Sequence, residues 1–217
     1  VWLKPPQGRQ PAHPSECRDN MWEPAGEATI TDEGTNAMTW EKEVAGIGAR
    51  KEFAHELGGA EAIQKHHDRG RLTVRERIDH LLDNKSFREQ GPIAGGSETD
   101  EQGELKSFTP ANYVVGFGKI SDRPCIVGGE DFTLKGGSPS SAGFRKSVWA
   151  EELACRYRFP LIRFLEGGGG SVPRGNNKSE TTGNMESVNA PPRFMSVMQA
   201  MATVPVASAA LGAVAGL

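Results

Sequence analysis

Strand-like and helix-like segments alternate from Tyr113 to the end of the 217-residue chain, and glycine-rich turns follow the strands. The expected strands cover residues 113–118, 125–127, 131–134, 161–165 and 204–211, and the expected helices cover 143–157 and 191–202. Strands that alternate with helices at this spacing predict an α/β domain with right-handed crossovers. The glycine turns then lie at the carboxyl ends of strands, where open α/β sheets bind their ligands.

The sequence before Tyr113 has a different pattern. Residues 1–37 are rich in Pro, Glu, Gly, Asn and Thr and lack apolar periodicity, so we expect a disordered tail. Short helices are expected over 38–57 and 60–68. Apolar residues recur at helical spacing in the first of these helices and in the last predicted helix of the chain. They predict buried faces made of Trp40, Val44 and Ile47, and of Phe194, Met195, Met198 and Met201.

Thr73 and Glu76 form a capping box, in which the hydroxyl and the carboxylate each bind a free backbone N–H. The helix that it begins is expected to end near residues 83–84. The basic stretch around this helix is interrupted by acidic residues, which favours a solvated helix face; it contains Arg69, Arg71, Arg75 and Arg77. Residues 89–111 are rich in Gly, Ser, Asp and Glu and predict a long loop.

Composition excludes several classes of function. A net charge of −3 gives no electrostatic reason to expect a nucleic-acid partner. The three cysteines include no CxxC pair, so no metal site is expected, and reduced thiols favour a cytoplasmic protein, or a mitochondrial-matrix protein in a eukaryote. No run of 18 apolar residues is present, and we expect no membrane association. The adjacent His66 and His67 point to different sides of a helix, which favours a surface position for the pair.

Four consecutive glycines, Gly167 to Gly170, directly follow the apolar strand that ends at Leu165 and Glu166. Such a turn can direct its backbone N–H groups at one point, where they would bind a phosphate or a developing oxyanion. A flexible loop is an equally open interpretation from the glycines alone. The dinucleotide-binding fingerprint and the P-loop are both absent, because no GxGxxG or GK[ST] occurs here.

Several blocks in sequence order resemble the carboxyltransferase (beta) subunits of biotin-dependent acyl-CoA carboxylases of the propionyl-CoA and methylcrotonyl-CoA type. The resemblance covers about residues 40–217, and its main blocks are residues 70–79, Leu81-Leu82-Asp83, Ser86-Phe87, residues 115–120, Arg123-Pro124, Asp131-Phe132-Thr133, Gly136-Gly137-Ser138 and Lys146. It implies a crotonase-like (ClpP/crotonase) α/β fold with β-hairpin and strand–helix repeats, preceded by short helices and the disordered tail. Residues 38–217 would form the N-terminal, acyl-CoA-binding domain. We expect this domain to be truncated at its C-terminal end, with the biotin-side C-terminal domain absent.

The same resemblance implies transfer of CO2 from carboxybiotin to the α- or γ-carbon of an acyl-CoA, through an enolate held by two backbone oxyanion holes. One hole falls on Gly168 and Gly169, where the family usually has Asp-Ser-Gly-Gly-Ala; here Glu166 replaces the aspartate and Gly167 the serine. The acyl-CoA side is expected to include Gly136, Gly137 and Lys146. The implied cofactor is biotin on a partner, with a biotin carboxylase and biotin carrier subunit as partners and a homo-oligomer, a dimer or trimer of dimers, as the assembly.

Two other functions stay open at this point. One is a non-catalytic acyl-CoA-binding or assembly subunit, which the altered glycine turn favours. The other is a biotin-coupled acyl-CoA decarboxylase, which shares this domain. The isolated 217-residue chain is expected to carboxylate no substrate.

Overall fold

The computed structural model describes residues 39–138, 140–167 and 193–214. The tail expected at residues 1–37 and the glycines at positions 168–170 lie outside the described residues. Residues Thr39–Leu217 form one structural unit, and the description below concerns that unit.

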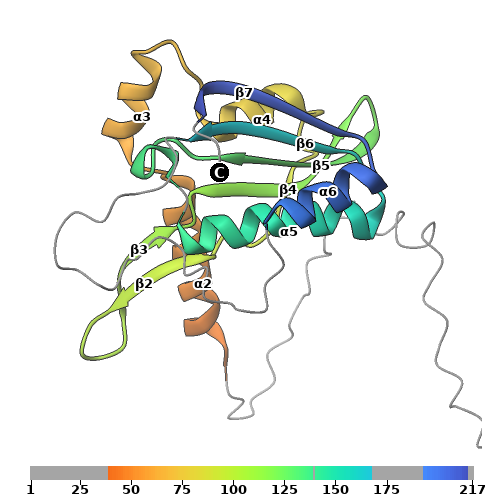
Figure 1. The fold of residues 1–217 in the computed structure, drawn as a ribbon. Helices are drawn as coiled ribbons and strands as arrows, with labels where there is room; N and C mark the ends of the chain where they lie inside the picture. The colour runs from red at the N-terminus through yellow and green to blue at the C-terminus, as the bar shows by residue number, and fades with distance from the viewer. Residues whose placement is uncertain (1–38, 139, 168–192, 215–217) are drawn as a thin grey trace, which may run out of the picture. The chain divides into compact units, whose positions relative to one another are not determined.

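A five-stranded sheet in the order β1-β4-β5-β6-β7 is the centre of this unit (Figure 1). The strands are β1 (Arg88–Glu89), β4 (Tyr113–Ile120), β5 (Arg123–Glu130), β6 (Leu161–Gly167) and β7 (Val206–Val214). The pairs β1–β4 and β4–β5 are antiparallel, whereas β5–β6 and β6–β7 are parallel. The predicted hairpin and the predicted α/β alternation are therefore confirmed.

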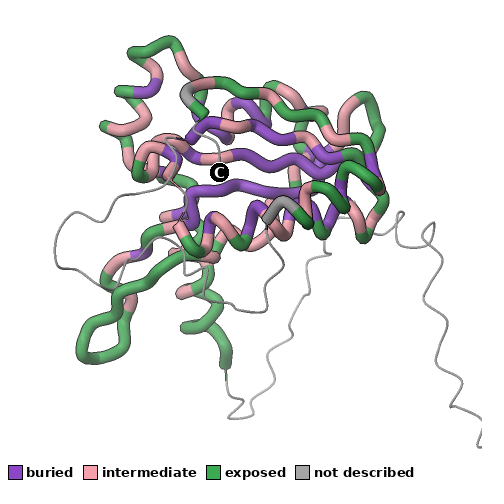
Figure 2. The backbone as a smooth tube through the Cα atoms, in the orientation of Figure 1, coloured by how far each residue is buried: buried purple, intermediate pink, exposed green. Residues whose placement is uncertain are grey.

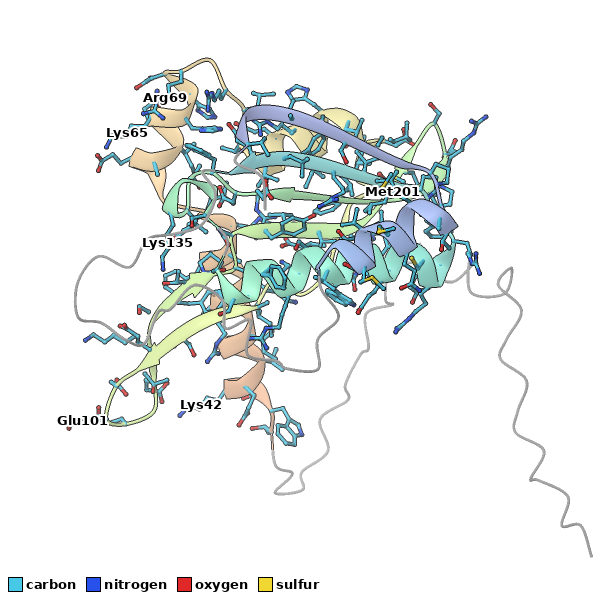
Figure 3. The ribbon with its side chains drawn as sticks, viewed as in Figure 1. Lys42, Lys65, Arg69, Glu101, Lys135 and Met201 are labelled. Carbon is cyan, nitrogen blue, oxygen red and sulfur yellow. The ribbon has the colours of Figure 1, made fainter. Side chains whose placement is uncertain are left out.

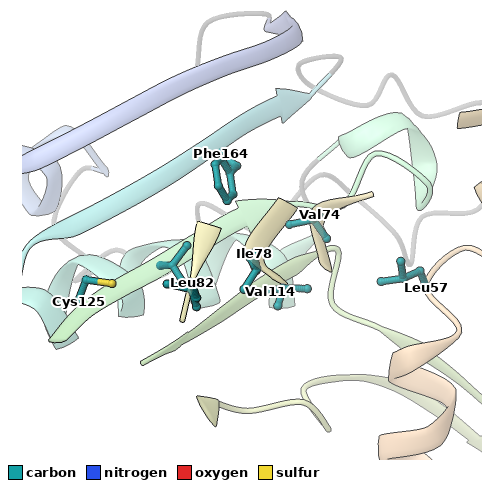
Figure 4. Packing of buried hydrophobic residues seen from close by; sticks show 8 residues of the cluster. Leu57, Val74, Ile78, Leu82, Val114, Cys125 and Phe164 are labelled. Atoms are coloured by element: carbon teal, nitrogen blue, oxygen red, sulfur yellow. The ribbon is translucent and has the colours of Figure 1, made fainter. Parts of the chain in front are cut away.

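Helices cover both faces of the sheet. Helix α5 (Ser141–Tyr157) makes the crossover from β5 to β6, and α6 (Arg193–Thr203) lies beside α5 and leads into β7 (Figure 1). Helix α4 (Val74–Leu81) packs on the opposite face of the sheet. Successive side chains of a strand point to opposite sides, so the central strands contribute buried residues to both faces. The buried cluster on the α4 side contains Leu57, Val74, Ile78, Leu82, Val114, Cys125, Val127 and Phe164 (Figure 4). Figure 2 shows that β4, β5 and β6 carry most of the buried backbone.

The start of α4 confirms the predicted capping box. The Thr73 N–H donates to Glu76 Oε2 at 2.7 Å, and the Glu76 N–H donates to Thr73 Oγ1 at 3.3 Å. Two further helices precede it, α2 (Glu41–His55) and α3 (Ala60–His67). These bounds agree closely with the two short helices expected from the sequence.

The long loop predicted over residues 89–111 is wrong. This region forms a second sheet, in which β2 (Gly95–Thr99) pairs antiparallel with β3 (Leu105–Pro110). The turn between the strands is closed by the Asp100 carboxylate, which accepts hydrogen bonds from the Gln102 and Glu104 backbone N–H groups. Composition indicated a loop because polar residues dominate, but hairpins with both faces largely exposed are polar too.

The strand predicted over residues 131–134 is also wrong. Strand β5 ends at Glu130, and the next carboxylate, Asp131, accepts hydrogen bonds from the Thr133 N–H at 2.9 Å and the Thr133 hydroxyl at 2.6 Å. Such a local side-chain bond competes with the strand ladder and turns the chain. A short 3-10 helix, η1 (Lys135–Gly137), follows.

The predicted burial of two helical faces is not observed at the positions whose side chains the structure describes; the Phe194 side chain is not among them. The α6 methionines Met195, Met198 and Met201 are 49%, 61% and 65% exposed, and Figure 3 labels Met201 on α6. Helix α6 instead packs with Ala200 buried, against α5. Trp40 and Val44 of the first predicted helix are likewise exposed. Periodicity identifies an apolar face, but it does not say what the face contacts. No helix in the described ranges is long and apolar enough to cross a membrane.

Candidate active site

The carboxyl ends of β5 and β6 meet at one edge of the sheet because the two strands are parallel. Glu130 ends β5, and Glu166 and Gly167 end β6. The Glu166 N–H donates a hydrogen bond to Glu130 Oε2 at 2.7 Å, which links the end of β6 to the end of β5. The predicted oxyanion residues Gly168 and Gly169 come next in the sequence and lie outside the described residues.

The predicted acyl-CoA residues Gly136 and Gly137 lie at this edge, with φ angles of 62° and 71°. A Cβ on Gly137 would stand 2.3 Å from the Glu166 carbonyl oxygen and 2.8 Å from Gly167 Cα, so only glycine allows this approach. A Cβ on Gly136 would meet nothing within 4 Å. The structure therefore brings the Gly136-Gly137 pair and the end of β6 together, although some 30 residues separate them.

The Glu166 side chain is 1% exposed and is surrounded by basic groups. Arg71 Nη1 donates to Glu166 Oε1 at 3.1 Å, Arg77 Nη1 donates to Oε2, and His66 Nε2 lies 3.6 Å from Oε2. These groups come from the end of α3, from the α3–α4 loop and from α4. We call these four residues, His66, Arg71, Arg77 and Glu166, the Glu166 cluster.

This cluster corrects two expectations from the sequence. Arg77 is 9% exposed and bound to a buried carboxylate, so it does not belong to a solvated helix face. Buried His66 differs from the expected surface position, and its ring nitrogen also contacts the Leu72 carbonyl at 3.2 Å. The available signal was an ionisable residue inside an apolar strand, because a buried Glu166 requires a basic partner. The densest group of arginines in the sequence lies at residues 69–77.

Lys146 is also buried, at 5% exposure, on α5. Its Nζ lies 3.7 Å from Glu89 Oε1, and Arg75 Nη1 donates to Glu89 Oε2 at 2.8 Å. Burial lowers the pKa of Lys146 to about 8, and Glu89 partly opposes that change. The expected contact between Lys146 and acyl-CoA stays a prediction. In this structure the ammonium group lies against Glu89 rather than at the surface.

Asn112 was not expected at the site, yet it holds the segment that leads into α5. Its Nδ2 donates to the Ser138 carbonyl, and its Oδ1 accepts from the Ser140 N–H at 3.0 Å and the Ser140 hydroxyl at 2.9 Å. Ser140 in turn caps α5 by accepting from the Gly143 N–H. A lone asparagine before a strand carries no sequence signal for this role. Within the described parts of the chain, no group of three or more His, Cys, Asp or Glu residues is arranged to hold a metal ion.

Comparisons with known proteins agree with the geometry. Residues 65–215 match the carboxyl transferase domain family. The chain is 38% identical over 121 residues to the biotin-dependent 3-methylcrotonyl-coenzyme A carboxylase beta1 subunit of Mycobacterium tuberculosis, covering 54% of this chain and 22% of that protein. It is 32% identical over 154 residues to the methylmalonyl-CoA carboxyltransferase 12S subunit of Propionibacterium freudenreichii, covering 70% of this chain and 29% of that protein.

Solved structures show the same fold. The transcarboxylase 12S hexamer has a TM-score of 0.53 at 31% identity, covering 64% of this chain and 27% of that one. A single-chain, multi-domain long-chain acyl-CoA carboxylase has a TM-score of 0.57 at 26% identity, covering 78% of this chain and 17% of that one. The fold is that of the carboxyltransferases, which are crotonase-like, as predicted. The chain belongs to the carboxyl transferase domain family. It spans less than a third of the length of the two curated relatives described above.

Proposed function

We propose that this chain is the acyl-CoA-binding part of the carboxyltransferase component of a biotin-dependent acyl-CoA carboxylase. The observation that carries the proposal is the approach of Gly137 to Glu166 and Gly167, within a chain that matches the carboxyl transferase domain family. That approach puts bare backbone at the carboxyl end of β6, directly before the glycines expected to form an oxyanion hole.

The proposed chemistry is transfer of CO2 from carboxybiotin to the α- or γ-carbon of an acyl-CoA. Carboxybiotin, carried on a partner subunit or domain, would supply the CO2, and the biotin left behind would take the proton that the acyl-CoA carbon loses. The residues of this chain orient the thioester, and the N–H groups of Gly168 and Gly169 stabilise the negative charge that forms on its oxygen as the enolate develops. Gly136 suits close approach of a ligand, since no atom lies within 4 Å of where its Cβ would be.

The whole reaction needs more than this chain. The two curated relatives extend well beyond the part that this chain matches, and we propose that a second carboxyltransferase domain, a biotin carboxylase and a biotin carrier complete the system. The hexamer assembly of transcarboxylase 12S supports a homo-oligomer of the complete protein. Of the two expected forms, the trimer of dimers has the six subunits of that assembly and the dimer does not. Purified alone, the 217-residue chain should bind propionyl-CoA but transfer no carboxyl group.

The decisive variant is Gly169→Val in a complete subunit that contains this chain. A branched side chain disfavours positive φ and would crowd the thioester, so the rate of carboxyl transfer to propionyl-CoA should fall by roughly 10²–10³. The matched control is Gly183→Val, in the polar stretch that follows, which should leave the rate unchanged. A Gly169→Val subunit with a normal rate and an intact fold would remove the oxyanion assignment.

A non-catalytic acyl-CoA-binding subunit is the second candidate. The turn Glu166-Gly167-Gly168-Gly169-Gly170 departs from the family pattern at its first, second and fifth positions, which favours this candidate. Binding of propionyl-CoA without any carboxyl transfer by the complete subunit would support it. The decarboxylase alternative would instead release CO2 from a malonyl-type thioester in the same assay.

A further inference from the structure

Contacts to both the backbone and the side chain hold Glu166 in place. Its N–H is bound by the Glu130 carboxylate at 2.7 Å, and its carbonyl faces Gly137. A Cβ on Gly212, from β7, would lie 2.7 Å from Glu166 Oε1. The side chain is therefore held between β7 on one side and the basic groups of the Glu166 cluster on the other.

Such a cluster adds little net stability to the folded chain. Removing a carboxylate and its partners from water costs several kcal/mol per ion, and an apolar replacement of similar size is often as stable. Buried charge networks do, however, impose one geometry, because every alternative arrangement leaves a charge unpaired. Here that geometry is imposed on the last two residues of β6.

We propose that Glu166 is a positioning residue for the reaction: its carboxylate, locked by Arg77 and Arg71, fixes the direction in which the backbone leaves β6 at Gly167. This inference rests on the proposed function, since the glycines that follow are the expected oxyanion donors. It predicts that disturbing Glu166 impairs stabilisation of an enolate more than it impairs binding of the ground-state thioester.

Gly137 and Gly103 provide a matched pair for the same idea. Gly103 lies in the turn between β2 and β3, outside the proposed site. Both glycines have positive φ, 71° and 82°, so alanine imposes a similar backbone strain at either position. A Cβ on Gly137 would collide with the Glu166 carbonyl and Gly167 Cα, whereas a Cβ on Gly103 would meet nothing within 4 Å. Gly137→Ala should therefore push the end of β6 aside, whereas Gly103→Ala should not.

The test measures two dissociation constants for the full 217-residue chain by calorimetry, one for propionyl-CoA and one for a nitroalkyl-CoA whose ionised nitronate has the charge of the enolate. The unaltered chain should prefer the nitronate. Glu166→Gln should reduce that preference by roughly tenfold, which is less than the factor of roughly 10²–10³ expected for loss of a whole oxyanion donor. The affinity for propionyl-CoA should change less than about twofold. Gly137→Ala should lower the nitronate preference as Glu166→Gln does, and Gly103→Ala should leave it unchanged.

The outcomes separate the two proposals. An unaltered chain that does not bind propionyl-CoA would overturn the proposed function and this inference with it. Binding with an undiminished nitronate preference in Glu166→Gln would overturn only the positioning role. Should Glu166→Gln fail to fold, the comparison of Gly137→Ala with Gly103→Ala decides: equal nitronate preference in the two variants would exclude a role for the geometry at the end of β6.

Discussion

Two clusters of buried charge flank this sheet, and they differ in how completely their polar atoms are paired. In the Glu166 cluster, Arg71 binds one carboxylate oxygen and Arg77 the other, and Glu130 holds the backbone. In the second, which we call the Glu89 cluster, the members are Arg75, Glu89, Asp131 and Lys146. Two of its buried atoms, Arg75 Nε and Asp131 Oδ2, have no hydrogen-bond partner among the described residues.

The difference separates a rigid cluster from one that responds to pH. In the Glu89 cluster, burial lowers the pKa of Lys146 to about 8 and raises the pKa of Asp131 above its ordinary value. In both groups burial favours the neutral form, which happens where partners do not fully compensate desolvation. The two clusters therefore predict different consequences for charge removal, and three variants test the contrast.

The largest effect is expected for Arg77→Met. The variant leaves the Glu166 carboxylate buried without its least exposed arginine, and breaking a buried pair in this way costs about 3–5 kcal/mol. Urea unfolding of the 217-residue chain measures the loss. Arg71→Met is the matched control, since Arg71 binds the same carboxylate but is about one-third exposed, and it should cost about 1 kcal/mol or less. Equal losses would show that the carboxylate does not depend on the buried partner.

Lys146→Met is expected to act through pH. In the folded chain the lysine loses its proton near pH 8, and in the unfolded chain near 10.5. Between these values the unfolded chain binds more protons, so this group makes the folded chain more stable as pH rises from 8 to 10.5. Below pH 8 both states carry the charge, and the folded state bears its full desolvation penalty.

The measurable quantity is the difference in unfolding free energy between the unaltered chain and Lys146→Met. It should shift by about 3 kcal/mol in favour of the unaltered chain between pH 8 and 10.5. Burial also raises the pKa of Cys125 to about 11, so the contribution of this thiol to the stability of the folded chain falls as pH rises. Cys125 is present in both chains, and its contribution cancels in the difference. A difference that stays flat across this range would show that Lys146 titrates as it does in the unfolded chain.

The sequence predicted the sheet better than it predicted these clusters, for a physical reason. Alternation of strands and helices, the capping box at Thr73 and the glycine pair at 136–137 are local patterns, and the structure has them. The partners of Glu166 lie about 90 residues earlier in the chain, and the arginines were interpreted from their immediate neighbours, which are acidic. The prediction that the α6 methionines are buried failed for a similar reason, since an apolar face has the same periodicity whatever covers it.

The smallest effect is expected for Asp131→Asn, which is the sharpest test of incomplete pairing in the Glu89 cluster. Asparagine keeps the oxygen that accepts from Thr133 and removes the charge whose burial raises the pKa of Asp131. A carboxyl group with a raised pKa stabilises the folded chain less as pH rises through that pKa, so the unaltered chain is penalised at neutral pH. The variant should therefore be more stable by about 1 kcal/mol at pH 7, and the gain should shrink as pH falls towards 4. Thr133→Val is the control, because it removes the hydroxyl that Asp131 accepts from and should be destabilising. An Asp131→Asn chain that is less stable at pH 7 would mean that the nearby Arg75 and His66 already compensate the carboxylate, and the contrast between the two clusters would disappear.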